Sequence, residues 1–350
     1  MDIHLFLMRS PDQDTLKRCA PGAQVQPVEE GFEARWFDLR VTLERLGSDS
    51  AAEVRRHLAG FGCPQELADR VGESGVVLAI APGPGSDLSG RPERLIRELS
   101  RELEGLIASE RFILDGDGRV LFGAPPDPDR VVRRALALSA VVYRGYIEEF
   151  AAAAFQDAHH DALAWIRLYG FEQELEGYEL RLVRASQREP HRQEIVNATW
   201  RAEGLVVLAW ALGILETLPE LERPVHPKGI SASIGFLLPE LPPEAARPRL
   251  RSGEELERQR SRIWGFYRRL RSFSLDRKPV DFRAAGQELD LPLADGDLAI
   301  GGVPLSQVSA EDFGRCMSIA QERALAIAWV MGAHPLYSVV PLPPDGPPSS

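Results

Sequence analysis

Residues 193–213 read Gln-Glu-Ile-Val-Asn-Ala-Thr-Trp-Arg-Ala-Glu-Gly-Leu-Val-Val-Leu-Ala-Trp-Ala-Leu-Gly. At about 100° per residue, apolar side chains recur on every side, which predicts a helix buried all round. Arg201 interrupts one apolar row and Glu203 the opposite one, about 200° away, so the two cannot pair with each other. A buried charge is costly unless it is paired. The stretch therefore predicts either an ion-pair network inside a helical domain or a polar site.

A second segment repeats this pattern. Residues 203–213 align without gaps on residues 322–332, and the first Glu, an Ala, the Trp and the last Gly coincide. Both segments are typical of buried helices that end at a C′ glycine. Similar packing requirements would explain the likeness, and the alternative is a pair of equivalent central helices packed side by side. We expect Glu322 and Arg323 to supply the partners of Arg201 and Glu203.

Composition limits the classes of function. At 350 residues the chain predicts two domains, and its net charge of −11 disfavours a general nucleic-acid binder. Cys19, Cys63 and Cys316 are too far apart for a disulfide framework or a metal motif, which favours a reducing compartment. The first residues have no basic segment or cleavage site of a signal peptide. The longest uncharged run is too short to span a bilayer, so we expect a cytoplasmic protein.

The chain is expected to be an α+β protein, with a small N-terminal α/β domain followed by a larger all-α helical domain. The first domain is placed at residues 1–122, with strands from Ile3 to Met8, from Arg35 to Leu43 and from Val76 to Ala81. A hairpin is expected around Asp115-Gly-Asp-Gly. A helix beginning at Pro92 should present one apolar face, formed by Leu95, Ile96, Leu99, Leu103, Leu106 and Ile107.

Residues 123–129 are predicted to be a linker, with Asp129 capping the next helix. The helical domain is placed at residues 130–340 and a disordered tail at 341–350. Proline-rich connectors are expected at 216–228 and 239–249. The expected helices lie near residues 129–157, 160–169, 189–212, 229–238, 252–274 and 309–331.

The helical part resembles a known family. The pattern Asn197, Trp200-Arg-x-Glu-x-Leu-x-Val-Leu-x-Trp-Ala-Leu-Gly213 is similar to a bacterial family catalogued only as domain of unknown function 4272. A basic helix around residues 264–270 and the closing segment 322–332 also resemble it, so the resemblance covers about 130–335. The family's closing helix usually carries a histidine and an asparagine that this chain does not match. The resemblance implies a helical fold and no established activity.

Several short segments resemble known catalytic or binding motifs but lack residues that those motifs require. Residues 85–90 have the glycine spacing of a phosphate loop, but Arg91 and Pro92 replace its lysine and hydroxyl residue. Residues 229–235 miss the nucleophile elbow by one glycine, and no strand precedes them. His159-His-Asp161 lacks the i, i+4 spacing of helical metal ligands, and Asp115-Gly-Asp117 lacks the acidic residue that ends a calcium loop. We therefore assign no catalytic, cofactor-binding or metal-ligating residue and expect no cofactor.

Two features could still contact a partner. Residues 247–278 carry eleven basic residues against four acidic ones. The plainer interpretation is an amphipathic helix whose arginines pair with acidic neighbours, and the alternatives are docking to an acidic protein partner or to RNA. The constellation of Glu194, Asn197, Arg201, Glu203, Glu322 and Arg323 could be a core network. It could also be a cleft that holds an anionic or amide ligand.

The sequence thus favours a non-enzymatic interaction, accessory or immunity-type protein. The alternative is a hydrolase-like enzyme with an Arg/Glu polar site between helices of the C-terminal domain. A nucleic-acid-associated regulator acting through residues 247–278 is a third hypothesis and the least favoured. We expect no membrane contact, and the sequence leaves the oligomeric state open.

Overall fold

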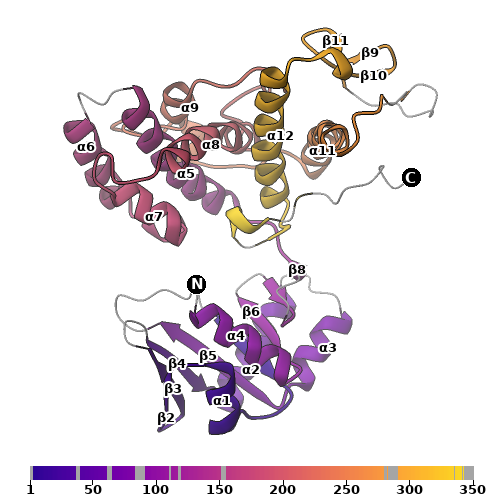
Figure 1. Ribbon diagram of the computed structural model, residues 1–350. Helices are drawn as coiled ribbons and strands as arrows, with labels where there is room; N and C mark the ends of the chain where they lie inside the picture. The colour runs from indigo at the N-terminus through magenta and orange to yellow at the C-terminus, as the bar shows by residue number, and fades with distance from the viewer. Residues whose placement is uncertain are drawn as a thin grey trace. The chain divides into compact units, whose positions relative to one another are not determined.

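The fold is taken from a computed structural model of the chain. It describes residues 3–36, 40–60, 65–82, 91–109, 112–116, 120–150, 155–279, 282, 291–334, 336–340 and 342. The chain divides into two compact units (Figure 1). The N-terminal unit comprises Met1–Pro125 with Gly332–Pro335, and the helical unit comprises Pro126–Met331 with Leu336–Ser350.

The N-terminal unit is built on an antiparallel sheet of strand order β2-β3-β4-β5-β1-β6-β7-β8. Its strands are β1 (Ile3–Leu7), β2 (Gln24–Val28), β3 (Gly31–Arg35), β4 (Arg40–Arg45), β5 (Val76–Pro82), β6 (Leu106–Ser109), β7 (Phe112–Leu114) and β8 (Val120–Gly123). Its helices are α1 (Gln13–Cys19), α2 (Ser48–Gly60), α3 (Gln65–Glu73) and α4 (Arg91–Glu102).

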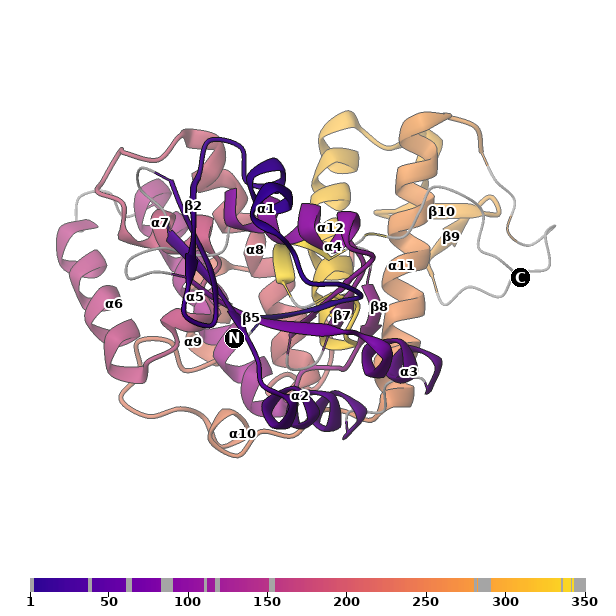
Figure 2. The ribbon, with the colours of Figure 1, turned by 90° about the horizontal axis from the view of Figure 1, so that it is seen from below.

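Alternation along β1 gives this sheet a core on each face. Leu5 and Leu7 pack into a cluster with Leu16 of α1 and Leu99 of α4, whereas Phe6 points to a second cluster under α2 and α3. Figure 2 shows α1 and α4 on one side of the sheet and α2 and α3 on the other. The predicted α+β class is confirmed, and the N-terminal sheet is antiparallel throughout its described pairings.

Two predicted elements of this unit were wrong in detail. The single strand expected from Arg35 to Leu43 is the end of β3 and most of β4, which pair with each other, Arg35 opposite Arg40. Val41 and Leu43 are buried as expected, and Phe37 and Leu39 lie outside the described residues. The apolar face from Pro92 does not continue through residues 106 and 107. The helix ends at Glu102, and those two residues begin β6.

The predicted hairpin is confirmed by the pairing of β7 with β8, although residues 117 and 118 of its turn lie outside the described residues. Asp127, not Asp129, caps the first helix of the helical unit. Its carboxylate accepts a hydrogen bond from the Arg130 amide at 2.8 Å, and Pro128 takes the first helical position.

The helices of the helical unit are α5 (Pro128–Phe150), α6 (Phe155–Tyr169), α7 (Gly177–Arg184), α8 (Arg192–Ala211), α9 (Pro227–Ser233), α10 (Pro243–Ala246), α11 (Gly253–Leu275) and α12 (Ala310–Val330). Helices α7 and α10 were not predicted, and the helix expected near 229–238 ends at Ser233. Short 3-10 turns are η2 (Glu172–Glu174), η3 (Leu305–Gln307) and η4 (Tyr337–Val339). Helix α8 packs against α5 and α12, and α12 also packs against α11 (Figure 1).

The long helix expected near 129–157 ends at Phe150, and α6 begins earlier than expected, at Phe155. The unit is also not wholly α-helical. Strands β9 (Leu293–Ala294), β10 (Asp297–Ile300) and β11 (Val303–Pro304) form a small antiparallel sheet. Residues 85–90, where the phosphate-loop motif was rejected, lie outside the described residues, as does the predicted tail apart from Leu342.

Helices α8 and α12 are the two central helices that the internal repeat suggested. They pack against each other, and both are followed by a glycine in the left-handed region, Gly213 with φ 76° and Gly332 with φ 85°. Among the residues that the structure describes, no helix has the length and apolar character needed to cross a bilayer. Both described cysteines are buried thiols, and burial raises the pKa of Cys19 to about 12 and that of Cys316 to about 11.

Candidate functional site

The Glu203–Arg323 pair lies in the core between α8 and α12. The guanidinium of Arg323 donates two hydrogen bonds to Glu203 Oε2, at 2.9 and 2.8 Å, and a third to the carbonyl of Pro219 at 2.7 Å. The other carboxylate oxygen accepts the amide of Val225 at 2.7 Å. Glu203 is 1% exposed and Arg323 is fully buried. The pair is closed off from solvent, and its charges are satisfied by protein groups.

The Arg201–Glu322 pair joins the same two helices but is less enclosed. Arg201 Nη1 donates to Glu322 Oε2 at 2.9 Å, and Nη2 donates to the Tyr178 hydroxyl at 2.7 Å. Both side chains keep about an eighth of their surface, 14% and 13%. Burial raises the pKa of Glu322 despite the nearby Arg201. Burial is the largest influence on the pKa of Arg201 and would lower it, but the attractions to Glu322 and to its other neighbours together outweigh burial, so the net pKa is raised.

These contacts confirm the predicted pairing of Arg201 and Glu203 with Glu322 and Arg323. Asn197 and Glu194 do not join the cluster. Asn197 accepts a hydrogen bond from Gln193, and Glu194 closes a capping box at the start of α8 by accepting the His191 amide. The predicted constellation is therefore a core network of two pairs with two peripheral members.

A third buried pair was not predicted. Arg134 of α5 and Glu179 of α7 form a bidentate contact with distances of 2.8 and 2.6 Å, and both side chains are nearly inaccessible. The sequence did carry a signal for it, because Arg134 lies in the mostly apolar run 131–142, which also holds Arg133 and Ser139, much as Arg201 interrupts its own row. Arg269 of α11 and Asp297 of β10 form a further buried bidentate pair, at 2.6 Å for each bond.

Tyr337 completes the cluster around Arg201. Its ring is 4.6 Å from the Arg134 guanidinium carbon and 5.5 Å from that of Arg201, and it lies beside the ring of Trp329. Tyr337 is 1% exposed, and burial raises the pKa of its hydroxyl. No local pattern indicated this role, because Tyr337 falls after the last predicted helix.

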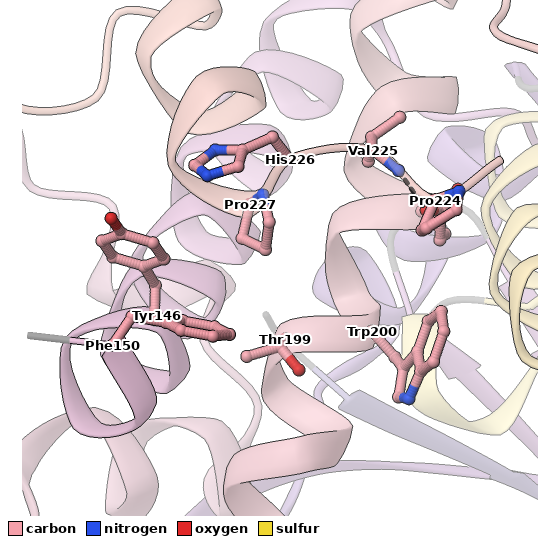
Figure 3. A pocket seen from close by; sticks show the side chains of 9 residues that line it. Tyr146, Phe150, Thr199, Trp200, Pro224, Val225, His226 and Pro227 are labelled. Atoms are coloured by element: carbon pink, nitrogen blue, oxygen red, sulfur yellow. Dashed lines mark hydrogen bonds between the residues drawn. The ribbon is translucent and has the colours of Figure 1, made fainter. Parts of the chain in front are cut away.

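A separate pocket of about 380 Å³ opens beside α8 (Figure 3). Tyr146 and Phe150 of α5 lie on one side of it and Trp200 of α8 on the other. The remaining lining comes from α8 and from the connector that leads into α9, namely Thr199, Glu203, Pro224, Val225, His226 and Pro227. Rings and prolines dominate this lining, so the pocket suits an apolar group.

The polar groups inside the pocket are already used by the protein. Both Glu203 oxygens accept the bonds described above, and the Thr199 hydroxyl donates to the Val196 carbonyl at 2.8 Å. His226 caps α9 by accepting the Gly229 amide on Nδ1 at 3.3 Å. Among the described residues, the indole N–H of Trp200 and the Tyr146 hydroxyl donate to no protein acceptor, and Figure 3 shows the Tyr146 hydroxyl pointing away from the other lining residues. The lining of the pocket is therefore largely apolar.

Residues 123–263 match the family described as "Domain of unknown function (DUF4272)". The predicted resemblance is confirmed over this range, and no family matches the N-terminal region. The basic residues 264–270 and the closing segment 322–332, which also resembled the family, lie outside the match. A comparison with curated proteins and one with solved structures found no match.

The DUF4272 match contains the whole pocket and one member of each α8–α12 ion pair, Arg201 and Glu203. The partners Glu322 and Arg323 lie beyond it. The matched segment therefore relies on a helix outside the match to neutralise Arg201 and Glu203, whereas Arg134 and Glu179 pair within it.

The basic segment 247–278 is mostly α11, and the match ends within it. Arg251 turns inward, donating to the carbonyls of Trp210, Leu215 and Glu216 at the end of α8. Arg258 pairs with Glu254 and Arg260 with Glu257 on the same helix. These arginines pair with acidic neighbours as the plainer interpretation expects. Docking of this segment to a protein partner or to RNA stays a prediction.

The weaker motifs have structural roles where they are described. His159 Nε2 contacts the Val183 carbonyl at 2.7 Å, and its ring packs on Phe155. Ser231 and Ser233 of α9 bond to carbonyls within or just before their own helix. Within the described ranges, no group of three or more His, Cys, Asp or Glu residues could hold a metal ion.

Proposed function

We propose that this chain is a non-enzymatic binding protein of the interaction, accessory or immunity type that acts in the cytoplasm. Its helical unit would hold an apolar side chain of a protein partner in the pocket between α5, α8 and the connector into α9. One observation carries the proposal: the pocket has an aromatic, largely apolar lining, and the charged groups around it already have partners within the protein. The partner's chain would supply a carbonyl or carboxylate acceptor for the Trp200 N–H.

The alternative of a hydrolase-like Arg/Glu site has less support. A general base needs an oxygen or nitrogen atom within hydrogen-bond reach of substrate. Glu203 lines the pocket, and both oxygens of its buried carboxylate accept hydrogen bonds, one from Val225 and the other from Arg323. The Arg201 guanidinium is held by Glu322 and Tyr178.

The test compares variants in an affinity purification. Tagged full-length protein is recovered from its native cell as the wild type, Phe150→Ser and Trp200→Ala, with bound proteins quantified by mass spectrometry. Phe150 is exposed, so its replacement alters the pocket without disturbing the core. Leu168→Ser on α6 is the matched control, because Leu168 is also exposed but does not line the pocket.

We expect a partner that the wild type and Leu168→Ser retain and that both pocket variants lose by about tenfold or more, as for an aromatic hot spot. Unfolding transitions of all four proteins confirm that they are folded. A partner bound equally by all four would contradict the pocket as the binding site. Catalytic turnover of a captured small molecule that depends on Glu203 would replace the proposal with the enzyme alternative.

A further inference from the structure

Tyr337 occupies a slot that the helices form around it. Its side chain comes from η4, which follows α12 near the yellow end of the ribbon (Figure 1). The guanidinium carbons of Arg134 and Arg201 lie 4.6 and 5.5 Å from the centroid of its ring. Trp329 lies beside it at 6.1 Å between ring centroids. The slot is therefore lined by two cations and an aromatic ring.

Gly204 of α8 gives the slot its depth. A Cβ atom at this position would overlap the Tyr337 hydroxyl oxygen and come within 3.2 Å of the ring carbon that bears it. Glycine is unfavourable in the middle of a helix. Its presence in the buried centre of α8 is explained by the space that an aromatic group with a hydroxyl substituent needs there.

Tyr337 fits this slot in shape but not in hydrogen bonding. Its hydroxyl oxygen is buried and has no hydrogen-bond partner among the described residues. A buried polar group without a partner destabilises the arrangement that buries it. The surrounding charges, Arg134, Arg201, Glu179 and Glu322, are instead engaged with one another. An occupant whose polar atom is unsatisfied is easier to displace than one that is fully bonded.

The segment that carries Tyr337 is tied down at the next residue. The Ser338 amide donates to the two carboxylate oxygens of Glu176, at 3.1 and 3.3 Å, and Glu176 is the N-cap residue of α7. Val340 is also buried. This attachment can open without unfolding α8 or α12, because it involves a short 3-10 turn and not a long helix.

We propose that residues 336–340 are a strap whose Tyr337 plugs a binding slot, and that the slot takes an electron-rich aromatic ring with a hydroxyl group when the strap opens. The guanidiniums favour the face of such a ring. An anion is disfavoured, because Glu179 and Glu322 already neutralise Arg134 and Arg201. The slot is separate from the pocket beside Trp200 and does not depend on the function proposed for it.

The first experiment tests whether the strap opens. Hydrogen exchange of the Ser338 amide is measured in the full-length wild type, Gly204→Ala, Tyr337→Phe and the double variant. Gly204→Ala should expel the tyrosine and speed Ser338 exchange by about tenfold or more, while the central amides of α8 stay protected. Removing the hydroxyl relieves the overlap, so the double variant should exchange close to the wild-type rate. Equal Ser338 exchange in the wild type and Gly204→Ala, or simultaneous loss of α8 protection, would overturn the strap.

The second experiment tests the ligand class. Full-length Tyr337→Ala is titrated calorimetrically with p-cresol, with N-acetyltyrosinamide and with 4-methylcyclohexanol, which has the hydroxyl but no aromatic face. The phenols should bind at least about fivefold more tightly than the cyclohexanol because of the two cation–π contacts. Tighter binding of the tyrosine derivative would indicate a partner's tyrosine as the natural occupant, and tighter binding of p-cresol a small phenol. Equal binding of all three, or none, by the folded variant would overturn the assignment.

In the wild type, the better phenol at high concentration should speed Ser338 exchange, because it competes with Tyr337 for the slot. The phenol is added at ten times the concentration that saturates Tyr337→Ala. Unchanged exchange of the Ser338 amide at that concentration would show that Tyr337 is a permanent part of the core. If Tyr337→Ala does not fold, this competition in the wild type and the Gly204→Ala exchange decide the question.

Discussion

The two ion pairs between α8 and α12 use the same residue types on the same helices, yet they have different surroundings. Glu203 and Arg323 are completely buried, and three hydrogen bonds reach the Glu203 carboxylate. Arg201 and Glu322 keep some exposure, and within the described part of the chain the Glu322 side chain accepts a bond from Arg201 alone. The first pair borders the pocket, and the second lies under Tyr337.

This difference shows why a buried charge is not by itself evidence of a catalytic site. A buried charge needs partners that compensate for its lost hydration. A carboxylate whose oxygens are all engaged by such partners is less able to act as a base toward a substrate. The Glu203–Arg323 pair is therefore a structural element that supports the pocket wall. The Arg201–Glu322 pair is the one placed where a ligand could compete with a side chain of the protein.

The largest effect is expected from breaking the enclosed pair. Arg323→Ala leaves the Glu203 carboxylate buried beside a single amide donor, so the free energy of unfolding should fall by about 3–5 kcal/mol. Urea denaturation measures this. Arg258→Ala, which removes an exposed pair on α11, is the control and should cost about 0.5 kcal/mol or less. A loss below that of the control would show that the enclosed pair is not a structural element.

Breaking the more open pair should cost less. Arg201→Ala removes the bonds to Glu322 and Tyr178 and the contact with the Tyr337 ring. Because solvent reaches both partners, the free energy of unfolding should fall by about 2 kcal/mol, between the values typical of exposed and of buried pairs. The same denaturation series gives the number. A loss equal to or above that of Arg323→Ala would remove the distinction between the two pairs.

A smaller effect is expected at the helix ends, where a glycine follows both α8 and α12. Gly213 closes α8 with φ 76° and has open space around it, so Gly213→Ala meets only the backbone cost of the left-handed region. We expect a loss of about 1 kcal/mol in the free energy of unfolding. Gly253→Ala at the start of α11, also in open space, should be neutral or slightly stabilising. Equal losses at the two positions would argue against a glycine-dependent C-cap.

The pH dependence of stability should separate the pairs further. Burial raises the pKa of Glu322 above its ordinary value of about 4.5, so the folded state holds this proton more tightly than the unfolded state. The contribution of Glu322 to the free energy of unfolding should therefore fall as the pH rises from the unfolded pKa through the folded one, and stay constant above it. Subtracting the Glu322→Gln curve from the wild-type curve isolates this term from the other carboxylates. A difference curve that rises over this window would show that Arg201 lowers the Glu322 pKa below its unfolded value.

The sequence predicted the central part of the fold because the relevant signals are local. Charges that interrupt the apolar rows of α8, together with the repeat at residues 322–332, were enough to predict the pairing of Arg201 and Glu203 with Glu322 and Arg323. The order of apolar and charged residues along a single helix shows which charged side chains will be buried and must therefore find partners. The repeat then restricted the choice of partners to one other helix.

Features that depend on several distant segments could not be predicted in the same way. Alternating residues from Arg35 to Leu43 look like one strand because the alternation continues across the turn between β3 and β4. The pocket is formed where the end of α5 meets the connector at 224–227, and no local pattern encodes that meeting. Tyr337 is a single side chain after the last long helix, and its role follows from the space above Gly204.

The central claim is that the buried charged side chains of α8 and α12 neutralise one another and do not bind a substrate. A double-mutant cycle on Glu203→Met and Arg323→Met, followed by urea denaturation, tests it most directly. We predict that each single variant loses about 3–5 kcal/mol of unfolding free energy and that the double variant loses at least about 2 kcal/mol less than the sum. Losses that add to within about 0.5 kcal/mol would show that the two residues are not coupled, which would contradict the claim.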